Sequence, residues 1–558
     1  MRQRSRLISS VLVMIVLGAI LAAGCGATDT TPVGGVDTPE QRLRVALRAE
    51  PTTLDPHRIA DADDSAVAAQ LFSSLTRVVG DDLEVVPDLA EALGEASDDG
   101  TVVTYRLRED LAWSNGEALT AQDVVDGILR ALDPNTGAGL AYLLHDIEGA
   151  ADYNDCERNC DRVRDAVGVS ATDERTVEFR LVRPLPWFDQ LMGTTIAAPV
   201  YSAAVDQHGD EWTDVDNIVT SGPFTLVAAD AQRISLARND EWWDAGEVSL
   251  EEVTMEIVTN QSAAYRQFLN EELDAGFPKA FPGGEDIDEA KTDTRYMAFP
   301  SLGAQYLYLN TRSPRLRDPN VRRAIAIAID RTRIVDRITG QGEEPVVTVA
   351  PPGVPGFQVI EQGAQGFIQA DIDPDTGRAE QLLEEAGAPD NLRLSLYFSP
   401  EGSDTAQLVA QAIQDDLGSI GIEVRLTPLA DFNALYDLID PPLEDRIDMV
   451  YLGWLGDYGD AHAFYDPLTC ENPFNAAQFC DDRFDEVVQE IVDTQDAAAR
   501  FQKSKEAEAL LTGPDGAFPL VPLYSETSYT MVQDWVEGMA ITPLGGVDLT
   551  QVRIIDKG

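Results

Sequence analysis

The stretch GWLGDYGD, residues 453–460, places a carboxylate among aromatic side chains. Asp457 lies three residues after Trp454 and directly before Tyr458, with glycines on both sides. A carboxylate in such surroundings suits cation binding, because a charge removed from water requires an opposite charge or hydrogen bonds. Glycine, aspartate and tyrosine are also common in turns, so the stretch by itself favours a turn over a binding site.

Sequence motifs for catalysis are missing. The few lysines do not occur in a phosphate-binding G-x-x-x-x-G-K-[ST] loop, and none of the histidines begins an H-E-x-x-H zinc motif. No G-x-S-x-G sequence presents a serine nucleophile. Each histidine lies in a polar or turn-like context, which predicts surface or capping roles. We therefore expect a protein that is not an enzyme and carries no cofactor.

The composition describes a large and strongly acidic globular protein. A chain of 558 residues is too long for one hydrophobic core and is expected to form at least two domains. Its 97 acidic residues against 41 Lys and Arg give a formal net charge of −56. Phosphate contacts require clustered cations, so nucleic acid is not an expected partner.

The N-terminus has the pattern of a secretory signal. MRQRSR carries three arginines and precedes an apolar run that ends in small residues at position 24. The run is long enough for an uncleaved membrane anchor, which stays open as an alternative. LAAGC resembles the lipobox of bacterial lipoproteins, in which the signal is cut before a cysteine that then receives lipid, here Cys25; Ala22 departs from the usual leucine. Residues 25–41 are expected to form a tether without regular structure.

The other cysteines are even in number, as expected for disulfides in an oxidising compartment. Of the three possible pairings, the economical one joins Cys156 to Cys160 and Cys470 to Cys480. A zinc site is the alternative, but the spacings are not those of structural zinc ligands. We expect no bound metal.

Strands and helices alternate through most of the chain, which predicts the α/β class. Residues 101–134 read as a strand, a turn at Asn115-Gly116 and a helix capped by Thr120, with Asp123 completing the cap. Residues 168–181 read as a β-hairpin. Residues 318–340 read as one helix that Asp318 begins and Gly340 ends.

Six stretches in these segments resemble the family 5 extracellular solute-binding proteins of ABC importers, particularly the oligopeptide-binding and dipeptide-binding lipoproteins. The resemblance covers nearly all of the mature chain. The stretches, in the order found in the family, are LDPHRIADADDSAVAAQLFSSL, YRLREDLAWSNGEALTAQDVV, NIVTSGPFTL, DPNVRRAIAIAIDR, LVPLYSE and PLGGVDLTQVRI.

The resemblance implies a three-lobed periplasmic-binding-protein-like fold, type II and cluster C, with the ligand enclosed between two hinged lobes. The expected division is a signal peptide at 1–24 and a lipidated tether at 25–41, followed by three lobes. Lobe I is expected at 42–82, 206–302 and 521–558, lobe II at 83–205 and lobe III at 303–520.

The resemblance also implies a ligand site. Asp457 occupies the place of an aspartate that pairs with the α-amino group of a bound peptide, beside apolar walls from Trp454 and Tyr458 and main-chain partners in this stretch, including Gly453 and Leu455. The other candidates are an edge segment at Ala60, Asp61 and Ala62, a side-chain pocket at Phe432, and Tyr142. Tyr451 stands where some members have a basic residue, so no cationic end-cap for a peptide C-terminus is visible and ligand length stays open.

The implied function is capture of extracellular oligopeptides or dipeptides by lobe closure and their delivery to a permease with its ATPase subunits. The implied protein is a monomer, held at the extracellular face of the membrane by lipid on Cys25. One alternative is a relative that binds another solute, such as a nickel chelate, haem, an opine or a sugar. Another is a lipoprotein that senses a ligand and signals to a membrane partner.

Overall fold

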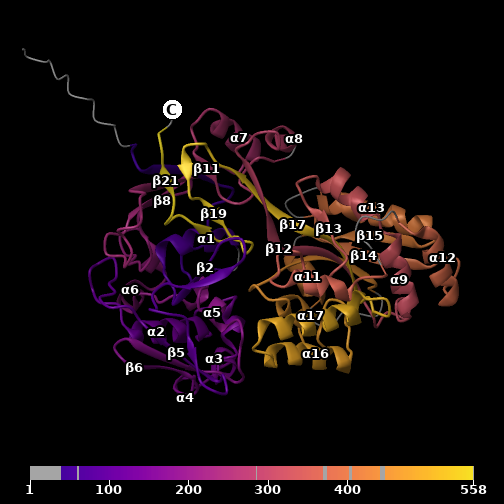
Figure 1. Ribbon diagram of the computed structural model, residues 1–558, viewed down its shortest axis with the longest axis horizontal. Coiled ribbons are helices and arrows are strands. Elements are labelled where there is room, and N and C mark those ends of the chain that lie inside the picture. Colours follow the sequence, from indigo (N-terminus) through magenta and orange to yellow (C-terminus); the bar gives the residue numbers. More distant parts are fainter. Residues whose placement is uncertain are drawn as a thin grey trace, which may run out of the picture. The chain divides into compact units, whose positions relative to one another are not determined.

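The computed structural model describes residues 39–556, except for 60–61, 284–285, 368–373, 401–404, 431 and 440–446. Of Ala62 and Phe432 it describes the backbone only. The described residues mix helices and strands, as the predicted class requires, and form three sheets of four or more strands (Figure 1). Each sheet draws on different parts of the chain.

The first sheet has five strands in the order β11-β1-β10-β9-β8. Its strands are β1 Arg42–Leu47, β8 Phe224–Asp230, β9 Arg233–Arg238, β10 Glu252–Ile257 and β11 Ala275–Gly276. Strand β1 runs parallel to both neighbours, whereas β8, β9 and β10 pair antiparallel. The helices of these chain segments are α1 Ala62–Leu71, α6 Ser202–His208, α7 Gln261–Leu269 and α8 Ile287–Ala290.

The second sheet has four antiparallel strands in the order β4-β5-β7-β6. They are β4 Glu95–Ala96, β5 Val102–Arg106, β6 Val169–Asp173 and β7 Thr176–Arg180. Between and after them lie α2 Ala121–Leu132, α3 Ala150–Asn154, α4 Asp161–Arg164 and α5 Phe188–Leu191. A short hairpin, β2 Thr76–Val79 with β3 Glu84–Pro87, precedes this sheet in the chain.

The third sheet has six strands in the order β13-β17-β12-β16-β14-β15. They are β12 Tyr296–Leu309, β13 Glu344–Pro345, β14 Arg393–Phe398, β15 Glu423–Pro428, β16 Met449–Leu455 and β17 Leu520–Met531. The accompanying helices are α9 Pro319–Ala328, α10 Arg331–Ile334, α11 Phe357–Ile360, α12 Thr376–Glu385, α13 Thr405–Ser419, α14 Phe432–Ile439, α15 His462–Tyr465, α16 Asp482–Asp493 and α17 Ala497–Thr512.

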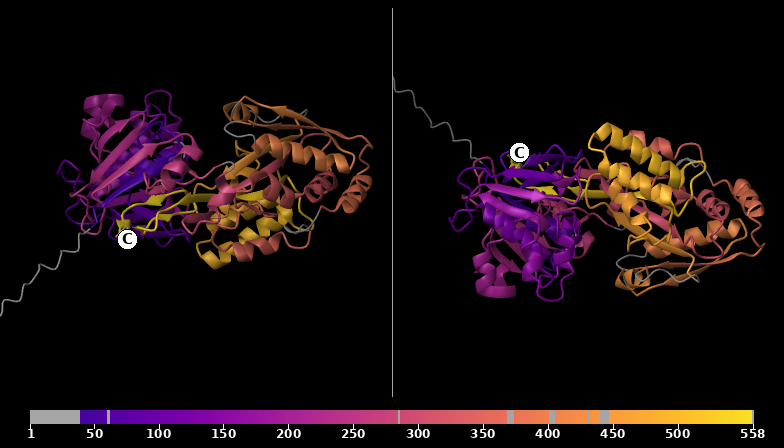
Figure 2. Two further views of the ribbon diagram at one scale, coloured as in Figure 1. Left: turned by 90° about the horizontal axis from the view of Figure 1, so that it is seen from above. Right: turned by 90° about the horizontal axis from the view of Figure 1, so that it is seen from below.

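Strands β12 and β17 connect the first and third sheets (Figures 1 and 2). They pair antiparallel from Tyr296 opposite Met531 to Tyr308 opposite Leu520. The Thr530 hydroxyl at one end of β17 donates to the Gly276 carbonyl of β11, 2.8 Å away. The other end lies in the six-stranded sheet, so these two long strands are shared between the two regions.

The β12–β17 ladder is interrupted near its middle. Pro300 pairs with Thr527 and Ala304 with Ser525, so residues 301–303 face a single residue of β17. Leu302, in this bulge, donates its N–H to the Pro543 carbonyl at 2.8 Å and accepts the Gly456 N–H at 2.7 Å. Its main-chain groups are satisfied outside the β12–β17 ladder, as buried backbone groups must be.

Several predicted local features are confirmed. The Thr120 N–H donates to the Asp123 carboxylate at 2.7 Å, and α2 begins at the next residue. Strands β6 and β7 form the expected hairpin. Asp318 caps α9 by accepting the Asn320 N–H at 2.8 Å. These features depend on partners within a few residues of each other in the chain.

The prediction of one helix over 318–340 is wrong. Helix α9 ends at Ala328, Ile329 has extended backbone angles, and α10 begins after Asp330. The Asp330 carboxylate accepts the Arg333 N–H at 2.8 Å, so it caps a new helix instead of continuing the first. The buried Arg331 guanidinium donates to the Ala326 carbonyl at 3.1 Å, which satisfies one carbonyl near the C-terminal end of α9.

A candidate ligand-binding site at the loop after β16

The loop that follows β16 begins where the chain leaves the third sheet. Gly453 pairs with Gln305 of β12, and a Cβ added to Gly453 would lie 2.2 Å from Gln305 Nε2. A side chain at position 453 would require the Gln305 side chain to move. Three residues later, the hydrogen bond from Gly456 to Leu302 fixes the start of the loop. Asp457 therefore lies in a loop, close to the fixed end of β16.

A cavity of about 510 Å³ lies against this loop. Leu455, Gly456, Asp457 and Tyr458 line one part of it. Other walls come from α1, from the region of the second sheet, through Leu140, Leu143 and Gln190, and from the turn 542–546 between β19 Ala540–Ile541 and β20 Val547–Asp548. Segments far apart in the chain thus enclose a space of the size that small ligands occupy in proteins.

Asp457 places an acidic group in the wall of this cavity. The Tyr142 hydroxyl donates to its Oδ2 at 3.0 Å. Burial raises the pKa of Asp457 to about 6, Tyr142 opposes the rise, and the nearby charge of Asp466 adds to it. Among the described residues no cation pairs with this carboxylate. A positively charged group entering the cavity would supply the opposite charge that the protein does not.

The two aromatic residues of the stretch are placed differently. Tyr458 is 9% exposed and lines the cavity. Trp454 does not lie among the described residues of the cavity wall; its indole Nε1 donates to the Ala463 carbonyl at 2.8 Å. The Trp454 ring packs against Phe474, with ring centroids 5.7 Å apart, and Phe474 in turn contacts Tyr142. Trp454 therefore packs behind the residues of the cavity wall and does not line the cavity itself.

The structure brings together some of the other predicted residues. Leu455 is 44% exposed and lines the cavity, and Tyr142 reaches Asp457. Ala60 and Asp61 lie outside the described residues. Ala62 begins α1 and Phe432 begins α14, and their side chains are not described.

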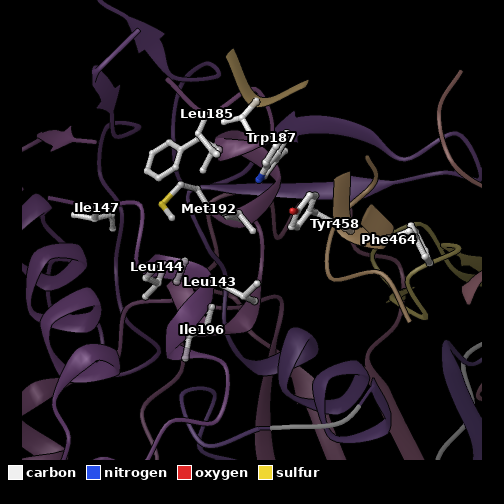
Figure 3. Packing of buried hydrophobic residues seen from close by; sticks show 14 of the residues in the cluster. Leu143, Leu144, Ile147, Leu185, Trp187, Met192, Ile196, Tyr458 and Phe464 are labelled. Carbon is white, nitrogen blue, oxygen red and sulfur yellow. The ribbon is translucent and has the colours of Figure 1, made fainter. Parts of the chain in front are cut away.

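Sequence reasoning missed three residues that hold the loop. Trp187 stacks on Tyr458 with ring centroids 4.8 Å apart and planes 7° apart (Figure 3). Trp187 also stacks on His462, with ring centroids 4.6 Å apart. The Gly459 N–H donates to Gln190 Oε1 at 2.6 Å. A hydrogen bond of 2.7 Å joins the Tyr458 hydroxyl to His462 Nδ1. No local pattern identifies Trp187 and Gln190, because their partners in the loop are distant in the sequence.

The prediction of surface or capping roles is wrong for two histidines. His57 and His462 are both buried. Burial, with help from the Arg130 charge, lowers the pKa of His57 to about 4, and its Nε2 lies 2.9 Å from the Ala198 carbonyl. Burial and the charge of Arg183 lower the pKa of His462 to about 3. Both imidazoles are neutral at ordinary pH and serve as packing and hydrogen-bonding groups.

A second, smaller cavity of about 200 Å³ adjoins the first. The two share Ala66, Leu455, Leu544 and Gly545 in their walls. The Lys279 ammonium in its wall lies 3.1 Å from the Glu526 carboxylate of β17. Glu526 also accepts a hydrogen bond from Gln305 at 2.8 Å. Burial raises the pKa of Glu526, but the Lys279 charge and the hydrogen bonds from Gln305 and Lys279 outweigh it and hold the pKa below its ordinary value. This cavity therefore contains both signs of charge.

The cysteines form two local disulfides within the described chain, Cys156–Cys160 and Cys470–Cys480, the pairs predicted above. Cys25 lies outside the described residues. The described side chains include no cluster of three or more histidine, cysteine or acidic groups suited to a metal ion. Within the same residues, no helix combines the length and apolar character needed to cross a bilayer.

The fold and this enclosed site are those of a binding protein, and comparison with known families agrees. The family described as bacterial extracellular solute-binding proteins, family 5 Middle, matches residues 84–476. The chain belongs to this family. Its members are transport binding proteins and not enzymes, so the expectation of a non-enzymatic protein is confirmed.

Individual relatives extend the similarity over nearly the whole chain. The oligopeptide-binding protein OppA of Bacillus subtilis is 28% identical over 537 residues, covering 94% of this chain and 95% of the relative. The probable deoxycholate-binding periplasmic protein YgiS of Escherichia coli is 26% identical, covering 90% and 91%. The solved structure of Haemophilus influenzae OppA in complex with RPPGFSPFR has a TM-score of 0.74 at 25% identity, covering 93% and 99%.

Proposed function

We propose that this protein captures peptides for an ATP-binding-cassette importer and binds their free α-amino group at Asp457. The observation that carries the proposal is the partly buried Asp457 carboxylate in the cavity wall, which has the Tyr142 hydroxyl as a partner but no paired cation among the described residues. An α-ammonium group would complete the pair and stabilise the ionised carboxylate.

The arrangement of the cavities supports an extended ligand. The larger and smaller cavities meet at Leu455 and Leu544, so a chain that starts at Asp457 can continue from one cavity into the other. The relatives OppA of B. subtilis and of H. influenzae are named for oligopeptide binding. Apolar wall residues such as Leu140 and Leu143 contact side chains without selecting one sequence, which favours broad tolerance.

Lobe closure is the proposed means of capture. The strands of the first sheet fall in 42–82 and 206–302, those of the second in 83–205, and most of the third in 303–520. Strands β12 and β17 extend across the borders proposed at 302 and 520, as expected for the connection about which two lobes move. Ligand contacts on both sides would favour the closed arrangement.

The proposed location is the extracellular face of the cell membrane. The N-terminal signal and Cys25 support a lipid anchor, and residues 26–41 would place the folded part away from the bilayer. The proposed partners are a permease and its ATPase subunits, and the proposed state is a monomer.

A retention experiment tests the peptide proposal. The protein is dialysed against a mixture of random tripeptides to pentapeptides with free amino ends, or against the same mixture after N-acetylation, and retained peptides are measured by mass spectrometry. We expect strong retention of the free-amine mixture only. Retention of neither mixture, or of both equally, would rule out recognition of the α-amino group.

A second candidate is a non-peptide amphiphilic solute. The similarity to YgiS, a probable deoxycholate-binding protein, and the leucines of the larger cavity favour this alternative. Deoxycholate added to the same dialysis distinguishes the two: a peptide-binding protein retains its peptides, whereas an amphiphile-binding protein exchanges them or binds deoxycholate alone.

A further inference from the structure

The loop 456–460 is held from one side by residues of the second-sheet region. Tyr142 donates to Asp457, Gln190 accepts from Gly459, and Trp187 stacks on Tyr458. Successive residues of the loop are thus contacted by side chains that lie 269 or more positions earlier in the sequence. Backbone hydrogen bonds also join Gly456 to Leu302, Asp460 to the Tyr458 carbonyl, and Ala463 to the Asp460 carbonyl.

Trp187 and Gln190 belong to one helical turn. Trp187 directly precedes α5, and Gln190 lies three positions later, so both side chains project from the same face. This turn is itself firmly fixed: the Asp189 carboxylate accepts the Tyr105 hydroxyl at 2.6 Å and the Gly94 N–H at 2.9 Å. A rigid element therefore carries the two residues that contact the loop.

The contacts made by Trp187 and Gln190 fix different residues of the loop. The stack of Trp187 on Tyr458, together with the hydrogen bond between Tyr458 and His462, fixes the residue directly after Asp457. The bond from Gly459 to Gln190 fixes a glycine that would otherwise have wide backbone freedom. With Gly456 bonded to Leu302, the backbone on both sides of Asp457 is held.

We propose that Trp187 and Gln190 are positioning residues that aim the Asp457 carboxylate into the cavity and thereby set the preference for ligands with a free amino group. The proposal rests on the proposed function of Asp457. It adds that the amine site is assembled jointly by the second-sheet region and the loop after β16, so the site is complete only when these two parts are in contact.

Gln190→Met gives the main test, because methionine keeps the length of the side chain and removes the acceptor for the Gly459 N–H. The two dialysis mixtures, free-amine and N-acetylated, are offered to the parent and the variant, and the ratio of retained free-amine to acetylated peptide is measured. Loss of this hydrogen bond is expected to lower the ratio by about fivefold to tenfold. Gln489→Met is the matched control, because Gln489 contacts Arg183 at 3.4 Å but does not touch the loop.

Trp187 supplies a second pair of variants. Trp187→Phe keeps an aromatic ring against Tyr458 and is expected to preserve most of the ratio, whereas Trp187→Leu is expected to lower it about as much as Gln190→Met. Circular dichroism checks that each variant is folded.

The outcomes separate this inference from the proposed function. If the parent protein shows no preference for peptides with a free amino group, both the proposed function and this inference are wrong. A parent with the preference, and a Gln190→Met variant with an unchanged ratio, would overturn the inference alone. Equal loss of both mixtures in the variants would also overturn it, because it would show a general structural role.

Discussion

Replacement of Asp457 by asparagine removes the charge and keeps the shape of the side chain. The asparagine carbonyl can still accept the Tyr142 hydroxyl, so the position of the group is expected to persist. Loss of one partner of a desolvated charge pair costs about 2–5 kcal/mol. The negative charge of Asp466 remains near the site and offsets part of the loss. We therefore expect the lower half of this range, about 30-fold to 300-fold in the affinity for a free-amine peptide.

The raised pKa of Asp457 makes this affinity dependent on pH. The ammonium binds the ionised carboxylate, but burial favours the protonated form in the free protein and places the pKa at about 6. Affinity should therefore rise with pH through 6 and level off near 7. At pH 5 about one-tenth of the carboxylate is ionised, so the affinity should be about tenfold below its plateau. Asp457→Asn should bind with no such dependence.

Calorimetry on four combinations measures the effect: parent and Asp457→Asn, each with one peptide in its free-amine and N-acetylated forms. If the carboxylate pairs with the amino group, the two changes together should cost little more than either alone. Asp98→Asn, at an exposed turn, is the control. Equal affinity of parent and Asp457→Asn for the free-amine peptide would refute the reasoning and leave Asp457 as a turn residue.

Three other perturbations have defined outcomes. Gly453→Ala should lower the free energy of unfolding by about 1–3 kcal/mol, because the added Cβ would displace the Gln305 side chain. Gly418→Ala, where the added Cβ has open space around it, should not lower it. Denaturant titration of the two variants measures the difference. Cys25→Ser should abolish incorporation of a radiolabelled lipid precursor, and labelling equal to the parent would remove the lipoprotein proposal. Because the pKa of buried His462 is about 3, below its ordinary value, thermal stability should fall as pH decreases from about 6.5 toward 3. His462→Asn should weaken that decline, and identical pH profiles would contradict the assignment.

Local chemistry in the sequence predicted the local structure well. The Thr120 cap, the hairpin at residues 168–181 and the Asp318 cap all depend on residues a few positions apart, so the residue types and spacing suffice. The division at Ile329 was missed because apolar periodicity continues through it. The Arg331 guanidinium next to the break donates to the Pro522 carbonyl, 191 positions away, and local periodicity does not show this partner.

The candidate site could be predicted only in part. The resemblance of GWLGDYGD to a family motif selected Asp457, and the structure places this residue in a cavity wall. Trp187 and Gln190 could not be found in this way, because their contacts with the loop are fixed by the packing of distant segments. The same limit explains His57 and His462, whose polar sequence neighbours gave no sign that the imidazoles are buried.

The bulge in the β12–β17 ladder has a mechanical consequence. Ladder hydrogen bonds stiffen a pair of strands, so bending is easiest at residues 301–303, where pairing with β17 is interrupted. Leu302 lies at this compliant point, and its two main-chain hydrogen bonds hold Gly456 on one wall of the cavity and Pro543 on the turn that forms another. A rotation of the Leu302 backbone would therefore move both walls at once. Bending of β12 and β17 at this point would change the width of the cavity.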